Sequence, residues 1–175
     1  MKRMALILLA LLLLTALGCG SKTPATDDPN VVFIDPNAVR GGEYGELYFE
    51  ANGVRFGIFD ESADVLSKLP AYRDTFTGES CAFDSADVYY YYSGFQIMTN
   101  EIDGTSRVTA ITVADDTVKT PQGLYIGMSE AEAGEAFPEL SEADWNLVDG
   151  TAQLSVAIVD GAVASIVYTP VGTED

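Results

Sequence analysis

Carboxylates are the most frequent side chains in this chain that could carry chemistry, and they occur in three clusters. The clusters are Asp60, Glu61 and Asp64; Asp115 and Asp116; and Glu130, Glu132 and Glu135. Acid–base catalysis needs two carboxyl groups in one cleft, with their pKa values pushed apart. Each cluster instead falls at an expected helix start or turn, where the helix dipole or turn chemistry favours carboxylates. We therefore expect structural roles and no metal site, with Asp115 and Asp116 as the one candidate for weak cation binding.

Nucleophilic catalysis has few suitable residues, because the chain contains no histidine. A Cys–His or Ser–His–Asp arrangement therefore cannot be built. The cysteines are Cys19 and Cys81, and we expect Cys81, which stands between small and aromatic residues, to be buried. These features predict a protein that is not an enzyme and holds no cofactor. A wall-glycan hydrolase that uses carboxylates is the less favoured alternative.

Four consecutive tyrosines are the least ordinary run in the sequence. Successive side chains alternate in a strand, so two of these tyrosines would face the core and two would face outward. Tyrosine is enriched at protein interfaces. We therefore define a tyrosine patch as a candidate contact surface. It consists of Tyr89, Tyr90, Tyr91, Tyr92 and Phe95. In the alternative, the other half of the protein covers the outer side of this strand.

The first nineteen residues indicate where the protein resides. Two basic residues precede an apolar run over residues 4–14, which is the pattern of a secretory signal peptide and is too short to span a bilayer. Gly18-Cys19 resembles the lipobox of bacterial lipoproteins. The resemblance implies removal of residues 1–18 and lipidation of Cys19. The protein would then be held at the extracytoplasmic face of the cell membrane by its lipid. An ordinary signal peptide with an incidental cysteine is the alternative.

The charge balance excludes one class of partner. The chain has 9 basic and 27 acidic residues, which gives a formal net charge of −18. Removal of a leader that contains Lys2 and Arg3 leaves seven basic residues and a net charge of −20. Such a polyanion repels nucleic acid, so we expect no nucleic-acid partner. The acidity is spread along the chain, which is typical of a solvated surface; a basic partner is the alternative explanation.

The composition divides the rest of the chain into a tether and one ordinary domain. Proline, glycine and polar residues mark residues 19–44 as a lipidated, flexible tether. Its apolar stretch 31–34 either docks on the domain or forms a short strand. We expect a first α+β repeat over 45–117, a second over 118–170 and a disordered tail over 171–175.

The first repeat is expected to begin with a hairpin, because Asn52-Gly53 between two apolar runs is typical of a type I′ turn. Asp60 is expected to cap a helix over 61–69, which Pro70 ends. We expect a loop from there to about residue 84. Strands are predicted over 88–92, 95–99 and 108–113, where aromatic and β-branched residues are frequent.

The second repeat shows the same order of elements. Residues 124–128 are similar to 54–58 and are expected to form a strand. Ser129 and Glu132 have the spacing of a capping box, which predicts a helix to about Phe137 with Pro138 as its stop. Strands are predicted over 145–148, 151–158 and 162–168. With Gly57 and Gly127 in register, we predict an internal duplication and an α+β fold, with short helices packed on antiparallel sheet.

Two resemblances accompany this pattern. Ser80-Cys81-Ala82-Phe83 and the Thr-Pro-x-Gly element at 120–123 resemble a group of small uncharacterised lipoproteins of clostridia-like Gram-positive bacteria, which have no assigned activity. More distantly, the repeat with Gly127-Met128-Ser129 is similar to the tandem-repeat fold of β-lactamase inhibitor proteins and small outer-membrane-assembly lipoproteins. These resemblances imply a non-catalytic module that binds an envelope protein or wall component. An envelope assembly or inhibitor module is the alternative.

Overall fold

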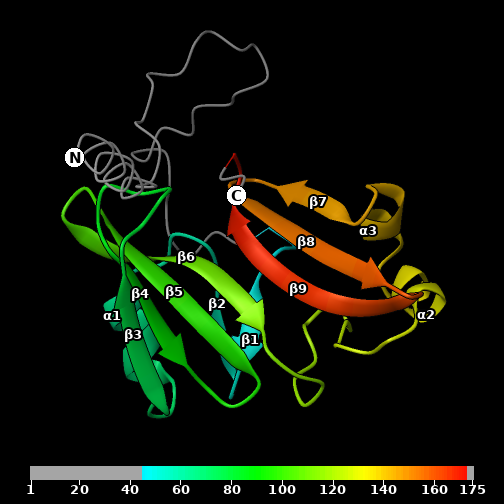
Figure 1. Cartoon of the computed structure of the whole chain (residues 1–175), viewed down its shortest axis with the longest axis horizontal. Helices are drawn as coiled ribbons and strands as arrows, with labels where there is room; N and C mark the ends of the chain where they lie inside the picture. The colour runs from blue at the N-terminus through cyan, green and yellow to red at the C-terminus, as the bar shows by residue number, and fades with distance from the viewer. Residues whose placement is uncertain (1–44, 173–175) are drawn as a thin grey trace, which may run out of the picture.

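The structure is a computed structural model that describes residues 45–172. It confirms the predicted α+β class, with a seven-stranded antiparallel sheet, a two-stranded sheet and short helices (Figure 1). The small sheet is β1 (Phe49–Ala51) and β2 (Val54–Phe56), and the helices are α1 (Ser62–Lys68), α2 (Glu130–Ala136) and α3 (Pro138–Glu142). The large sheet contains β3 (Asp74–Gly78), β4 (Asp87–Tyr91), β5 (Phe95–Ile102), β6 (Thr105–Val113), β7 (Asn146–Asp149), β8 (Ala152–Val159) and β9 (Ala162–Pro170).

The large sheet joins two antiparallel meanders in its middle. The strand order is β3-β4-β5-β6-β9-β8-β7, so β3 and β7 form its edges. The last strand of each meander, β6 and β9, meet at the centre. They are paired over Ile111 to Val113 of β6, which lie opposite Tyr168 to Ile166 of β9. This joint is short, and it places the two halves of the chain side by side (Figure 1).

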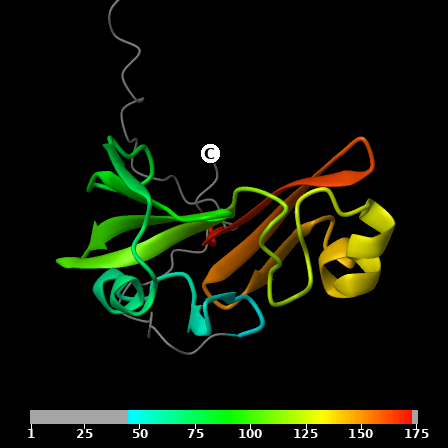
Figure 2. The ribbon, with the colours of Figure 1, turned by 90° about the horizontal axis from the view of Figure 1, so that it is seen from below.

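The helices and the small hairpin cover one face of the large sheet (Figure 2). Alternate strand residues on that face form the core together with apolar residues of the helices and the hairpin. Fully buried members include Phe49, Phe56, Ile97, Leu140 and Ile166. No helix covers the opposite face within the described range 45–172. We call this opposite side the open face.

The expected turn chemistry is present in the first hairpin. Asn52 and Gly53 have φ values of 54° and 77°, as a type I′ turn requires, and the turn joins β1 to β2. The same pair of positive φ values occurs at Asp103-Gly104 and Asp160-Gly161, which connect the long strands of each meander. These turns keep each strand next to the one that precedes it.

The capping box is also confirmed. The Ser129 hydroxyl accepts a hydrogen bond from Glu132 N, and the Glu132 carboxylate accepts one from Ser129 N at 3.1 Å. The box fixes the start of α2 close to β9. Pro138 ends α2 as predicted, but it also occupies the first turn of α3, where proline loses no hydrogen bond.

Three local predictions were wrong. Asp60 does not cap α1; Glu61 occupies the N-cap, and the Asp60 carboxylate accepts from Gly57 N at 3.0 Å. Residues 74–78 form β3, although the sequence predicted a loop there. Its side chains are exposed, so it lacks the apolar alternation by which a strand is identified. Residues 124–128 form turns instead of a strand, because Gly127 has a φ of 86° and bends the chain.

The two helix starts share one hydrogen-bond pattern, in a register that differs from the predicted one. Phe59 N donates to Val108 O at 2.7 Å, and Gly127 N donates to Val163 O at 2.8 Å. Both donors have positive φ values, 69° and 86°. Phe59, and not Gly57, therefore corresponds to Gly127. The duplication itself stays a prediction, and this correspondence supports it.

Candidate functional site

The tyrosine run lies in β4 and just beyond it, and its side chains alternate between the two faces of the sheet. Tyr89 is opposite Met98, and Tyr91 is opposite Gln96, on the open face. Tyr90 is opposite the fully buried Ile97 and packs against the core. The structure thus separates the predicted tyrosine patch into an outer pair, Tyr89 and Tyr91, and an inner group of three.

The inner part of the patch belongs to the core. Phe95 is 4% exposed, and its ring stacks on Tyr92 with centroids 4.7 Å apart and planes at 3°. Burial raises the pKa of Tyr92, and the neighbouring Tyr72 and Tyr90 raise it further. Phe95 and Tyr92 therefore stabilise the sheet from inside and do not contribute to a contact surface.

The outer part of the patch extends onto the edge strand, which the sequence did not identify. Phe76 of β3 is opposite Tyr89, and their ring centroids are 6.0 Å apart. Tyr89 stacks on Tyr91 at 6.4 Å with planes at 16°. Phe76, Tyr89 and Tyr91 form what we call the aromatic row. Phe76 is 57% exposed, and only the pairing of β3 with β4 brings it to the tyrosines.

The rest of the open face consists mainly of uncharged side chains in two cross-strand lines. One line contains Asp74, Tyr91, Gln96, Thr112, Val167, Ser155 and Asn146. The other contains Phe76, Tyr89, Met98 and Ala110, with Thr169, Gln153 and Val148 on the second half of the sheet. Asp74, at the sheet edge, is the one charged residue of the two lines, and Asp87, which alternates with Tyr89 along β4, adds a second carboxylate at the end of that strand. This face is unlike the remainder of a chain with 27 acidic residues.

A loop closes the open face at the far end of β5. Asn100, which is 1% exposed, donates through Nδ2 to Ala86 O at 3.2 Å and to Asp87 Oδ1 at 2.6 Å. Thr109 Oγ1 donates to Asn100 Oδ1. These bonds fix the end of the loop that contains Cys81, and Glu101 N donates to Ser85 Oγ of the same loop at 2.8 Å. Cys81 itself is exposed, so the prediction of a buried thiol was wrong. The loop is fixed by its polar groups and does not require an apolar cysteine.

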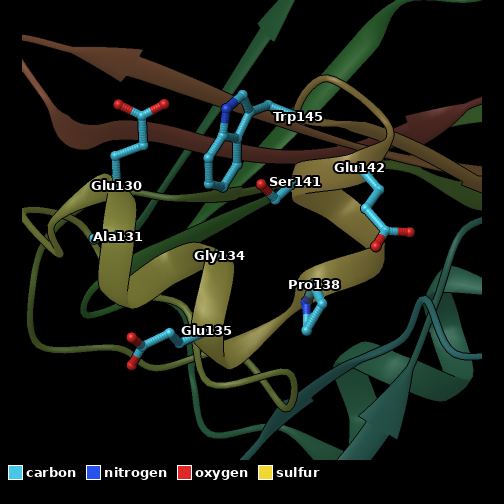
Figure 3. Close-up of a pocket in the computed structure, with 8 residues that line it drawn as sticks. All are labelled: Glu130, Ala131, Gly134, Glu135, Pro138, Ser141, Glu142 and Trp145. Carbon is cyan, nitrogen blue, oxygen red and sulfur yellow. The ribbon is translucent and has the colours of Figure 1, made fainter.

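A groove between α2 and α3 is the second candidate site (Figure 3). Its volume is about 390 Å³, and its lining includes Glu130, Glu135, Glu142 and Trp145. Figure 3 shows Glu130 beside the indole, whereas the carboxylates of Glu135 and Glu142 point in other directions. Carboxyl groups that do not converge cannot share a proton or flank one bond. The groove offers an aromatic wall with a neighbouring carboxylate.

The remaining carboxylate clusters have local structural partners. Asp115 Oδ1 accepts from the Thr117 hydroxyl and from Thr117 N, and these hydrogen bonds lower the pKa of Asp115. Glu132 accepts from Ser129, which lowers its pKa in the same way. Asp64 pairs with Lys68 at 2.6 Å within α1. No group of three potential metal ligands occurs in the part of the chain that the structure describes.

Several predictions concern residues outside the described range. The leader 1–18, lipidation of Cys19 and the tether 19–44 all lie there, as does the stretch 31–34. Of the predicted tail, only residues 171 and 172 are described, and they form a turn. Among residues 45–172, no helix is long and apolar enough to cross a membrane.

The fold and the site together define a one-sided antiparallel α+β sheet with an aromatic row at one edge. We found no family model that matches this chain, no curated protein that matches it, and no solved structure that matches it. The two resemblances drawn from the sequence therefore stay predictions. Function has to be argued from the molecule's own surfaces.

Proposed function

We propose that this protein is a lipid-anchored, extracytoplasmic binding module without catalytic activity, and that its open face contacts the partner. The observation that carries the proposal is the open face of a strongly acidic protein, whose two cross-strand lines contain a single charged residue, Asp74. Centres of protein interfaces are depleted of charge and enriched in tyrosine and phenylalanine. The aromatic row and the flanking Gln96 and Met98 have that composition.

The anchor is supported by the sequence. Gly18-Cys19 after a short apolar run has the pattern of a lipoprotein leader, and two acyl chains give a stable attachment. A module of this kind binds an envelope protein or a wall component close to the membrane. A net charge of −18 disfavours binding to nucleic acid.

The lack of catalysis is supported by the positions of the candidate acids and bases. Histidine is absent from the chain. The carboxylates of Asp60, Asp115 and Glu132 accept hydrogen bonds from nearby main-chain amides, as turns and helix starts require. The three glutamates of the groove between α2 and α3 diverge (Figure 3).

An envelope assembly or inhibitor module is the second candidate. It is favoured by the matched helix starts at Phe59 and Gly127, since a repeated helix–meander unit is the feature shared with those proteins. The two candidates differ in the envelope that they require. The assembly module needs a cell with an outer membrane, so the cell envelope of the source organism distinguishes them.

Crosslinking in intact cells tests the proposed function. The full chain is compared with Cys19→Ser, which cannot be lipidated, and with Tyr91→Ala, which removes one member of the aromatic row. Val159→Ala is the matched control, because Val159 is 56% exposed on the same face but lies at the end of β8, on the other half of the sheet from the aromatic row. We expect one envelope component whose yield falls in Cys19→Ser and Tyr91→Ala and is unchanged in Val159→Ala. Equal yields in all four proteins would contradict the proposal.

A further inference from the structure

We infer that β3, whose outer side pairs with no strand among residues 45–172, binds an extended, cationic peptide segment of the partner as an added strand. This inference rests on the proposed function and names the class of partner. Sheet edges bind extended peptides through main-chain hydrogen bonds, and sites beside alternate side chains give specificity. Four features of β3 and one of the opposite edge, β7, support it.

The outer side of β3 carries main-chain groups that the sheet does not use. Tyr92 N donates to Phe95 O on the β5 side. Because the main-chain N–H and C=O groups of successive residues in a strand point to opposite neighbours, this bond determines which residues of β4 bond to β5 and which to β3. The main-chain groups of Tyr89 and Tyr91 therefore bond to those of Phe76 and Asp74 in β3. The main-chain groups of the alternate residues Thr75 and Thr77 consequently point away from the sheet. Asp74 Oδ1 accepts from Thr75 N at 2.8 Å, which occupies one outward donor. Thr77 N remains directed at the outer edge.

Burial of apolar side chains in the core does not account for the presence of β3 in the sheet. Its first four residues are exposed, and Gly78 has no side chain to bury. The second meander, β7 to β9, has no strand in the equivalent place, because β7 is itself the edge. A strand that buries no apolar side chain contributes little hydrophobic stabilisation. An extra strand at this edge therefore fits a binding role better than a packing role.

Exposed aromatic rings lie on both sides of this edge. Phe76 is on the open face, and Tyr72 is on the opposite face, where its ring is 5.1 Å from the ring of Tyr90. Tyr72 and Phe76 are 44% and 57% exposed. Side chains of an added strand alternate between the two faces, so such a strand would direct residues toward both rings, which lie four positions apart in the chain.

The charges around β3 select a cationic segment. Carboxylates lie at both of its ends: Asp74 at the start, Glu79 after the last residue, and Asp87 opposite Gly78. Arg73 is the nearby cation, and its Nη2 donates to Ser93 Oγ at 2.9 Å. A second copy of the chain would bring another net charge of −18 to the same edge, which disfavours self-association. Lysine or arginine side chains would meet the carboxylates with their charged ends and the rings with their apolar stems.

The opposite edge, β7, is less open to an added strand. Asp149, the last residue of β7, accepts a hydrogen bond from Glu46 N at 2.5 Å. Gly45 lies so close to the Asp149 carboxylate that a Cβ on this glycine would clash with it. Residues 45 and 46 therefore lie against the side chain of the last residue of β7. Among the described strands, β3 is the edge whose outer side has both exposed rings and flanking carboxylates.

Fluorescence anisotropy with a labelled peptide tests the inference. The probe is an eight-residue peptide that alternates lysine with valine, and the protein is the full chain in neutral detergent. Thr77→Pro removes the outward N–H, while Thr77→Ala at the same position keeps it and is the matched control. We expect Thr77→Pro to bind about tenfold more weakly than Thr77→Ala, which corresponds to the loss of one hydrogen bond of about 1.4 kcal/mol. A peptide that alternates glutamate with valine should not bind.

A second measurement does not depend on the folding of a variant. Amide hydrogen exchange of the unsubstituted protein should slow at Thr77 when the lysine–valine peptide is added. Equal affinity of the two Thr77 variants, or unchanged exchange at Thr77, would overturn the inference, as would failure of the peptide to bind. A Thr77-dependent dimer in sedimentation would also overturn it, in favour of self-association.

The two proposals fail in different ways. If Tyr91→Ala lowers crosslinking in cells but the lysine–valine peptide does not bind, the open face is a contact surface and the β3 inference is wrong. If the peptide binds with the expected Thr77 dependence but crosslinking is unaffected by Tyr91→Ala, the edge is the site and the open face is not. Loss of both effects removes both proposals.

Discussion

Tyr168 Oη donates a hydrogen bond of 2.8 Å to Gln122 Oε1, and this bond joins the centre of the sheet to the start of the domain. The amide of the same Gln122 donates to Glu46 O at 2.6 Å. Tyr168 is 1% exposed, and its ring lies 6.0 Å from that of Phe49 in the hairpin. One glutamine thus connects β9 to the segment through which the chain enters the domain.

Tyr168→Phe should weaken this connection without creating a cavity. The substitution removes the hydroxyl and leaves Gln122 Oε1 without its donor, while the ring keeps its packing. We expect the free energy of unfolding to fall by about 1 kcal/mol, with an upper limit of about 3 kcal/mol if the freed oxygen stays buried. Denaturant unfolding measures the change. An unaltered midpoint would show that water replaces the hydroxyl at no cost.

Stability should fall at alkaline pH because of the same residue. Burial raises the pKa of Tyr168 well above its ordinary value of 10.0. The unfolded chain therefore loses the phenolic proton first as the pH rises, so the free energy of unfolding decreases from about pH 10 upward. Tyr168→Phe should show a smaller decrease than the unsubstituted protein over that range. Parallel curves for the two proteins would contradict this assignment, and Tyr92, whose pKa is also raised, would be the next residue to substitute.

Ser129→Ala should destabilise α2 through its first turn. The serine hydroxyl is the N-cap acceptor, and its loss lowers the free energy of unfolding by about 1 kcal/mol.

Glu132 should make the stability of the protein sensitive to acid. Its pKa is lowered by its bonds to Ser129, so it contributes stability above its ordinary pKa of 4.5, and this contribution is lost as the pH falls through the lowered pKa. Thermal unfolding at neutral and acidic pH should therefore show less acid sensitivity in Glu132→Gln. An identical acid profile would count against the capping role of the carboxylate.

Gly127→Ala should be costly although there is room for the added methyl group. No atom lies within 4 Å of the Cβ position, but the φ of 86° is unfavourable for an L-residue, at roughly 1–2 kcal/mol. Gly134→Ala is the control in the same region, since Gly134 lies inside α2 and gains helix propensity there. We expect the two substitutions to change the free energy of unfolding in opposite directions. A change of the same sign for both substitutions would show that the positive φ of residue 127 does not determine the effect of Gly127→Ala on stability.

Local signals in the sequence were sufficient for much of the fold. Asn52-Gly53 and the Ser129–Glu132 box act within four residues, and both formed as predicted. The long strands β5, β6, β8 and β9 were recognisable because their buried residues alternate. Such features depend on neighbours in the chain, so a single sequence contains them.

Features that depend on distant segments were missed. The residues of β3 are exposed, and only pairing with β4 makes them a strand. Asp60 has the residue type of a helix cap, yet its main chain pairs with Val108 and its carboxylate closes a turn to Gly57. Phe76 joined the candidate site for the same reason: its neighbour Tyr89 is thirteen positions away in sequence and directly opposite in the sheet.

The short joint between β6 and β9 has a mechanical consequence. It contains three residue pairs, whereas β5–β6 and β8–β9 contain eight each. The hairpin spans this joint, because the ring of Phe49 touches Phe95 on one side and Tyr168 on the other. Glu46, which precedes the hairpin, is itself bonded to Asp149 of β7 and to Gln122. If the Phe49 ring is lost, three residue pairs remain as the ladder between the two halves of the sheet, so we expect the hairpin to limit hinge motion at this joint.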